Sequence, residues 1–232
     1  MNSVLFNSES PSGSYQAYLA SVYAWMFWAL GLTGVVAYFV EVTPALSELI
    51  LDNAWLLFGL LGLEVLVVII ISSMIDRLSP ALAAMLFIGY SAMNGFTLAG
   101  IFTYFTGESL AIAFFVTAAT FAMMSLFGFV TKKDLSAWGS VLFMGLVGII
   151  LCSFTAIFIE TTLLTLVSSI LGIVVFAGLV AYDTRKMTDL FYGDGLSSPR
   201  KYSILGALTL YLDFVNLFLF FIRFFGKRKN SW

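Results

Sequence analysis

The 232-residue chain contains no histidine, a single cysteine and only four prolines. The absence of histidine excludes His-based catalytic triads, haem held by an axial histidine and His-rich zinc sites. The lone Cys152 cannot form a disulfide within the chain, and because it lies in an apolar run we expect it to pack as a small apolar residue. The four prolines fall only in expected tails, loops or first helical turns: Pro11, Pro44, Pro80 and Pro199.

Charge is also scarce. Only 10% of the residues are charged, against about a quarter in ordinary soluble domains, whereas 61% are hydrophobic. The formal net charge is −2, and the densest basic cluster is Lys227-Arg228-Lys229, which is too small to suggest a nucleic-acid partner. A membrane span needs about 20 mainly apolar residues, so seven spans occupy roughly 150 residues and leave only short loops. The composition therefore predicts an integral membrane protein whose main partner is the lipid bilayer.

The apolar segments predict an all-α, polytopic fold with seven transmembrane helices in one domain. The first 17 residues carry Glu9 and no Lys or Arg, so they lack the basic region of a signal peptide and are expected to form a flexible polar tail. The transmembrane domain would cover residues 18–226, followed by a basic tail, 227–232. The expected spans are 18–40, 54–75, 81–104, 109–130, 138–159, 163–187 and 203–225.

The distribution of Lys and Arg predicts a cytoplasmic N-terminus. These residues occur in the second, fourth and sixth connections between spans, which would share a side with the N-terminus, and are absent from the other three connections: Arg77, Lys132, Lys133, Arg185, Lys186, Arg200 and Lys201. One feature disagrees, because seven spans place the basic C-terminal tail on the opposite side. A re-entrant seventh segment is an alternative that would remove this conflict.

Three acidic residues lie inside the expected spans. An ionisable residue there costs about 2.5–3.5 kcal/mol on insertion scales, so each is a candidate functional residue. Glu64 lies near the middle of the second span and Asp213 near the middle of the seventh, while Asp183 lies about one turn inside the cytoplasmic end of the sixth. Glu64 has the alternative of being a buried structural hydrogen-bonding group. Asp183, beside Arg185 and Lys186, has the alternative of being an ordinary interfacial carboxylate.

Further polar residues accompany Asp213 on the seventh span. Thr209, Asp213 and Asn216 follow an i, i+4, i+7 spacing and form one polar stripe, which must face protein or water rather than lipid. Tyr182 and Tyr211 flank the two aspartates, so we expect their hydroxyls either to hydrogen-bond the carboxylates or to belong to the interfacial aromatic belt.

Two buried aspartates that share a proton would form a pH sensor. Two coupled carboxyl groups titrate as a pair, and in a chain without histidine such a pair is the ready route to proton sensing near neutral pH. Positive charge from Arg77 or Arg185 is expected to pair with the ionised form.

Several stretches resemble one known family. They are VVFAGLVAYDTRKM (174–187), KYSILGALTLYLDFVNLFLF (201–220), TKKDL (131–135) and GYSAMNGFTLAGIF (89–102). The chain resembles the Bax inhibitor-1 family, and its bacterial branch most closely. The resemblance implies a fold in which the last helix is central with six around it, a bacterial inner membrane and a proton-sensitive calcium leak. It also implies that Asp183 and Asp213 are the paired sensor, and that Glu64 and Arg77 match an acidic and a basic residue of the second span.

The resemblance, together with the buried acids, implies a pH-sensitive calcium or cation leak channel, not an enzyme. Asp183 and Asp213 would bind calcium transiently, and Glu64, Thr209 and Asn216 would line the ion path, with no bound cofactor. One alternative is a non-conducting modulator that binds a membrane protease or another channel. Another is an intramembrane aspartyl protease, but the required Gly-x-Gly-Asp motif is replaced by Leu-Tyr-Leu-Asp and no proline follows Pro199.

Overall fold

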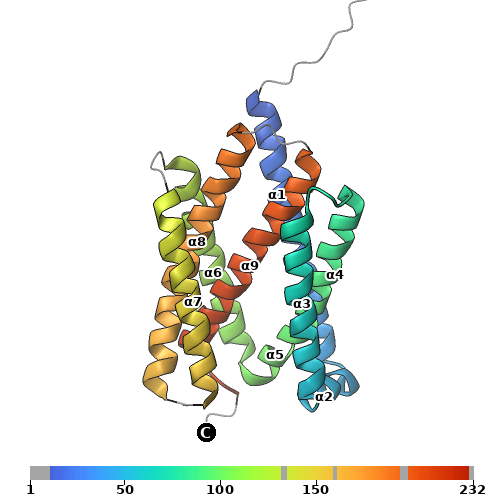
Figure 1. Ribbon diagram of the computed structural model, residues 1–232. Coiled ribbons are helices and arrows are strands. Elements are labelled where there is room, and N and C mark those ends of the chain that lie inside the picture. The colour runs from blue at the N-terminus through green and yellow to red at the C-terminus, as the bar shows by residue number, and fades with distance from the viewer. Residues whose placement is uncertain (1–10, 132–134, 159–160, 194–197, 230–232) are drawn as a thin grey trace, which may run out of the picture.

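The computed structural model describes residues 11–131, 135–158, 161–193 and 198–229, which form a bundle of helices (Figure 1). Seven of these helices are long and apolar enough to cross a membrane, as predicted, and two short ones, α2 and α5, lie together at one end. The helices are α1 (Pro11–Glu41), α2 (Pro44–Leu51), α3 (Ala54–Met74), α4 (Pro80–Leu98), α5 (Gly100–Tyr104), α6 (Gly107–Val130), α7 (Ser136–Phe158), α8 (Thr162–Gly193) and α9 (Pro199–Phe225). The all-α fold class is confirmed.

Local sequence signals explain where several helices begin. Asn53, Ser79 and Thr106 cap α3, α4 and α6, and each side-chain oxygen accepts a hydrogen bond from a backbone N–H in the first turn. Proline opens α2, α4 and α9, because its fixed φ suits the first helical turn and its missing N–H would have no partner there.

The tail expected for residues 1–17 is shorter in the structure, because α1 already begins at Pro11. The reason is a contact that the apolar pattern did not reveal. The Tyr15 ring packs against Phe191 and Tyr192 near the end of α8, and its hydroxyl lies 2.8 Å from Thr188 Oγ1. The first ten residues of the expected tail lie outside the described part of the chain, as do Lys132 and Lys133.

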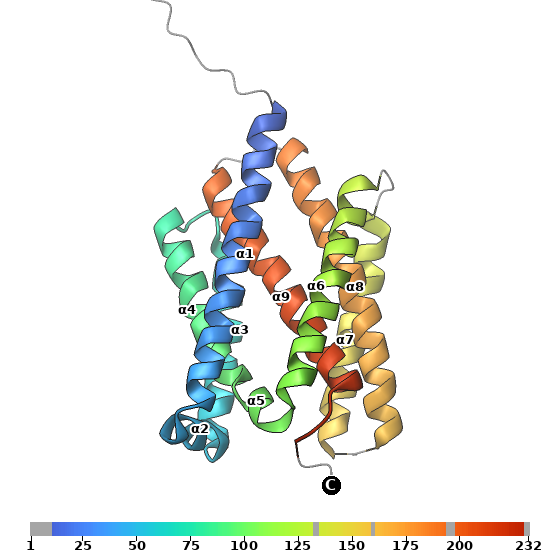
Figure 2. The same cartoon turned by 180° about the vertical axis from the view of Figure 1, so that it is seen from behind.

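Helix α9 occupies the centre of the bundle. In its most apolar stretch 67% of the residues are buried, compared with 11–33% in the other six spanning helices. Figures 1 and 2 show α9 crossing between two groups of helices, α1, α3 and α4 on one side and α6, α7 and α8 on the other. It packs against α1, α3, α4, α6 and α8, whereas α7 packs mainly against α8. The expected central position of the last helix is therefore present.

Close helix approach depends on glycine at two crossings. A Cβ atom at Gly128 of α6 would lie 2.5 Å from the carbonyl oxygen of Ala181 on α8. A Cβ atom at Gly95 of α4 would lie 2.8 Å from the carbonyl oxygen of Thr33 on α1. Small residues at such positions let backbones approach where lipid provides no hydrophobic drive for association.

The described part of the C-terminal tail, residues 227–229, lies at the end of the bundle opposite to the start of α1 (Figures 1 and 2). Its backbone pairs with the connection between α5 and α6: Thr106 N–H donates to Lys227 O (3.1 Å) and Lys229 N–H to Tyr104 O (3.0 Å). The Lys229 ammonium lies 3.8 Å from Glu41 Oε1 at the end of α1. The seventh segment is thus a full-length helix, and the re-entrant alternative is wrong. The basic tail is accommodated on the far side partly because Glu41 offers it a counter-charge.

Candidate functional site

Asp183 of α8 and Asp213 of α9 meet where these two helices pack. Their carboxyl groups interact directly with each other. Asp213 is only 4% exposed and Asp183 is half-buried. The buried Oδ2 atom of Asp213 has no hydrogen-bond partner among the described residues. The structure therefore brings together the two aspartates that the sequence predicted to form a pair, and it leaves one of their oxygens unsatisfied.

A cavity of about 240 Å³ leads to Asp183. It lies between the C-terminal half of α8 and the N-terminal half of α9, toward the end of the bundle where α1 begins. Thr209 lines it, as expected for a residue on the same face of α9 as Asp213. Asp183 thus stands between the cavity and the more deeply buried Asp213. The other lining residues are Tyr18, Ser72, Lys186, Met187, Leu190, Tyr202, Leu205 and Gly206.

Asn216, the last member of the predicted polar stripe, does not line this cavity. Its Nδ2 donates to the carbonyl oxygen of Leu212 one turn earlier, at 2.8 Å. Thr209 also donates to its own helix, from Oγ1 to Leu205 O at 3.1 Å. Thr209 and Asn216 therefore both donate their hydrogen bonds to backbone carbonyl groups of α9 itself.

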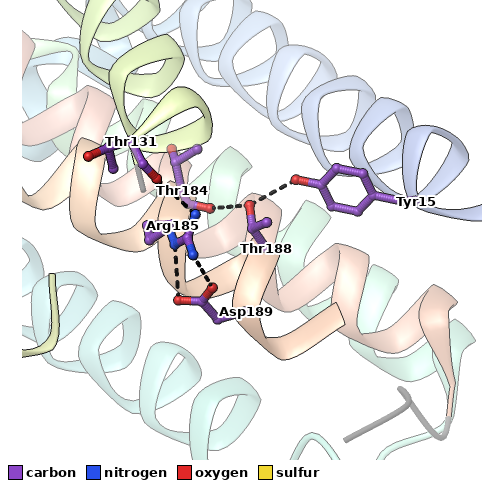
Figure 3. A network of polar contacts seen from close by, with 6 residues as sticks. All are labelled: Tyr15, Thr131, Thr184, Arg185, Thr188 and Asp189. Atoms are coloured by element: carbon purple, nitrogen blue, oxygen red, sulfur yellow. Dashed lines mark hydrogen bonds and ion pairs between the residues drawn. The ribbon is translucent and has the colours of Figure 1, made fainter. Parts of the chain in front are cut away.

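Arg185 has its own partners, Asp189 on α8 and the backbone of Thr131 (Figure 3). Its guanidinium forms a two-point contact with Asp189, with Nη2 3.0 Å from Oδ1 and Nε 3.3 Å from Oδ2. Its Nη1 donates to Thr131 O (2.9 Å), just after α6 ends. Thr188, which also contacts Tyr15, donates to Thr184 O (3.1 Å). These contacts fasten α1 and the end of α6 to α8, so Arg185 acts in this structure as a helix clamp.

Arg77, the other predicted charge partner, is exposed in the turn after α3. It is the neighbouring residue, Asp76, that connects this turn to α9. The hydroxyl of Tyr202 donates to Asp76 Oδ1 (2.8 Å), and the Lys201 ammonium donates to Asp76 O (3.0 Å). The cation that interacts with Asp183 is instead Lys186, which borders the same cavity. Sequence reasoning missed Lys186, although its i+3 position on a helix places it beside Asp183.

Glu64 belongs to a separate buried network on the other side of α9. Its Oε2 accepts a hydrogen bond from Asn94 Nδ2 (3.0 Å) and its Oε1 accepts one from Thr97 Oγ1 (2.9 Å). The Tyr211 hydroxyl donates to Asn94 Oδ1 (2.8 Å) and lies 2.7 Å from Thr33 Oγ1. This network joins α3, α4, α9 and α1 through neutral donors.

The two acidic sites are kept apart by the geometry of α9. Tyr211 and Asp213 are two residues apart and so project from opposite faces of the helix. The expectation that Tyr211 hydrogen-bonds an aspartate is therefore wrong. Tyr182 also points elsewhere, because its hydroxyl lies beside Gly139 on α7.

No group of three or more acidic, Cys or His side chains that could hold a metal ion occurs in the part of the chain that the structure describes. A calcium ion at the aspartate pair would need further oxygen ligands from hydroxyls, carbonyls or water.

The family is decided by comparison with known proteins. The family model described as "Inhibitor of apoptosis-promoting Bax1" matches residues 15–230. The chain belongs to the Bax inhibitor-1 family. The inner membrane protein YbhL of Escherichia coli K12 is 45% identical over 224 residues, covering 94% of this chain and 95% of YbhL. The chain is also similar to an uncharacterized protein of Borreliella burgdorferi, which is 36% identical over 92% of this chain and 93% of the relative. The uncharacterized protein YrjE of Lactococcus lactis is 32% identical over 97% of this chain and 96% of YrjE.

Membership of the Bax inhibitor-1 family confirms the resemblance read from the late-helix motifs, and with the seven apolar helices it establishes a multi-pass membrane protein.

The sequence did not predict that Asn94 and Thr97 are the hydrogen-bond partners of Glu64. Both lie in the 89–102 stretch that carried part of the resemblance. Polar residues in an apolar span were a usable signal for them.

Proposed function

We propose that this protein is a pH-sensitive calcium or cation leak pathway gated by the Asp183–Asp213 pair. The observation that carries the proposal is the direct contact of two carboxyl groups between α8 and α9, one of them 4% exposed with an unpartnered oxygen, next to a cavity that ends at the other. Ionisable side chains at such positions mark ion or proton pathways in membrane proteins.

The proposed switch is electrostatic. With one proton between them, the two carboxyl groups attract each other and hold α8 against α9. Loss of that proton leaves two negative charges in a medium of low dielectric constant, where their repulsion is strong. The helices then separate or a cation enters to compensate. Calcium suits this role because it prefers carboxylate, hydroxyl, carbonyl and water oxygens, and two acidic ligands give the weak binding that permeation needs.

A second cavity, of about 250 Å³, supports a path that continues toward the far end of the bundle. It lies between α1, α4, α5, α6 and α9, and its lining is almost entirely apolar, with Thr33 the one hydroxyl residue. Thr33 also contacts Tyr211 and thereby borders the Glu64 network. Fully buried Tyr211 and Leu210 lie on α9 at the level between the two cavities, which fits a closed state in which apolar side chains block the path.

We place the protein in a bacterial inner membrane with its N-terminus in the cytoplasm. The location rests on the name of the YbhL relative, an inner membrane protein. The orientation rests on the basic residues of the connections that share the N-terminal end of the bundle. In this orientation the cavity that reaches Asp183 opens on the cytoplasmic side.

Calcium flux into proteoliposomes, measured at several pH values, tests the proposal. The wild-type protein is expected to show a flux that changes with pH. Asp213→Asn is expected to show a weaker pH response with a shifted midpoint, because the remaining carboxyl group no longer shares a proton with a second acid. Asp52→Asn is the control, since Asp52 is an exposed acid at the C-terminal end of α2. An unchanged pH response in Asp213→Asn contradicts the sensor. Absence of flux in the wild type contradicts the leak and favours the non-conducting modulator.

A further inference from the structure

Lys186 lies beside Asp183 on α8 and borders the same cavity. It follows Asp183 by three residues on α8, and residues at this spacing are neighbours with Cβ atoms about 5–6 Å apart. Both side chains border the 240 Å³ cavity. Lys186 also borders a third cavity, of about 270 Å³, together with Leu135, Ser136, Tyr182, Arg185, Asp189 and Leu190.

The other charged groups near Asp183 already have partners. Arg185 on the same helix is bound by Asp189 and Thr131 O. At the end of α3, Asp76 is bound by Tyr202 and Lys201 of α9.

The remaining neighbours of Asp183 contribute no further cation. Helix α9 contributes Asp213, the second member of the pair. Helix α6 offers Ser125, which bonds Thr184, and α1 offers Tyr18 at the cavity wall. The Lys186 ammonium is therefore the one cationic group among the described residues that borders the cavity with Asp183 and forms no ion pair with another acid.

We propose that the Lys186 ammonium is a resident cation that competes with the permeating cation at Asp183 and disfavours divalent ions over monovalent ones. The inference rests on the leak function proposed above and names a selectivity-determining residue for it. A fixed positive charge repels a divalent ion with twice the energy that it exerts on a monovalent ion at the same distance. When a cation reaches Asp183, the flexible lysine side chain moves toward the 270 Å³ cavity, which it already borders.

Paired flux measurements on two lysine variants test this role. Proteoliposomes containing wild type, Lys186→Gln or Lys201→Gln are compared at one pH and low ionic strength for calcium and for potassium flux. Lys186→Gln is expected to raise calcium flux by roughly tenfold and potassium flux by roughly threefold, from the Coulomb energy of one charge at about 6 Å in water. Lys201→Gln removes the same charge at the same end of the bundle, where it binds Asp76 O, and is expected to leave the calcium-to-potassium ratio unchanged.

Chemical restoration of the charge separates electrostatics from side-chain shape. Lys186→Cys is prepared in a Cys152→Ser background and modified with a cationic or an anionic thiol reagent of similar size. The cationic adduct is expected to return calcium flux toward the wild-type value, and the anionic adduct to raise it further. Equal responses to both reagents, or an unchanged calcium-to-potassium ratio in Lys186→Gln, overturn the assignment of Lys186.

The same experiment distinguishes the two proposals when Asp213→Asn is included. A wild-type flux whose pH response is weakened and shifted in Asp213→Asn, together with an unaltered ion ratio in Lys186→Gln, rejects the role of Lys186 alone. No flux from the wild type rejects both the leak and its selectivity residue.

Discussion

At the scale of single residues, the buried acids Glu64 and Asp213 differ in how their oxygens are satisfied. Both oxygens of Glu64 accept hydrogen bonds from neutral side chains, at 3.0 and 2.9 Å. Asp213 has a buried Oδ2 without a partner in the described structure, and its neighbour is another acid. A satisfied polar network makes a packing arrangement rigid, whereas an unsatisfied oxygen is a place for a proton or a cation. From this contrast we propose that Glu64 stabilises the fold and that Asp213 belongs to the switch.

We predict that Tyr211→Phe destabilises the protein by about 1 kcal/mol, because Asn94 Oδ1 loses its donor inside the membrane region. The expected change is a fall of about 2–4 °C in the midpoint of thermal unfolding, measured in detergent micelles. Tyr38→Phe is the control, since Tyr38 on α1 is 61% exposed. Equal midpoints for wild type and Tyr211→Phe contradict a structural role for the Glu64 network.

At the scale of helices, the sequence predicted well where the membrane-spanning helices lie, but it did not predict which face of each helix packs against which neighbour. The long apolar runs predicted all seven spans, because a bilayer fixes helix length. The same runs could not show which face of α9 meets which neighbour, since in lipid the apolar residues lie on both inner and outer faces. Thr209 and Asp213 were correctly placed on one stripe, yet the partners of Arg185 and Tyr211 depended on helix crossings that no local pattern encodes.

We predict that Gly128→Ala weakens the packing of α6 against α8 by about 1–3 kcal/mol, because the added methyl group would meet the carbonyl oxygen of Ala181 at 2.5 Å. The thermal midpoint in micelles measures the effect. Gly59→Ala on α3 provides the control, since a Cβ there meets nothing within 4 Å and alanine is the better helix former. A Gly128→Ala variant as stable as Gly59→Ala shows that the two helices have room to move apart without cost.

At the scale of the whole molecule, α9 joins the two groups of helices by opposite faces (Figures 1 and 2). One face carries Tyr211, which is bound to α1 and α4, and the other carries Asp213, which meets Asp183 of α8. The first connection consists of hydrogen bonds between neutral side chains, while the second joins two carboxyl groups and, in the switch that we propose, depends on a proton. We therefore propose that repulsion between the two carboxylates on deprotonation moves α8 away from α9, while α9 stays bound to α1 and α4.

The central claim is that Asp183 and Asp213 hold one proton between them, and infrared difference spectroscopy across pH tests it most directly. We predict one protonated-carboxyl band that titrates in the wild type and persists in Glu64→Gln. The frequency and the pH midpoint of this band are expected to shift in both Asp183→Asn and Asp213→Asn. In each variant, the remaining aspartate has lost the carboxyl group with which it shares the proton. Two bands that titrate independently, each lost in one aspartate variant with the other unchanged, would contradict the shared proton and the gate built on it.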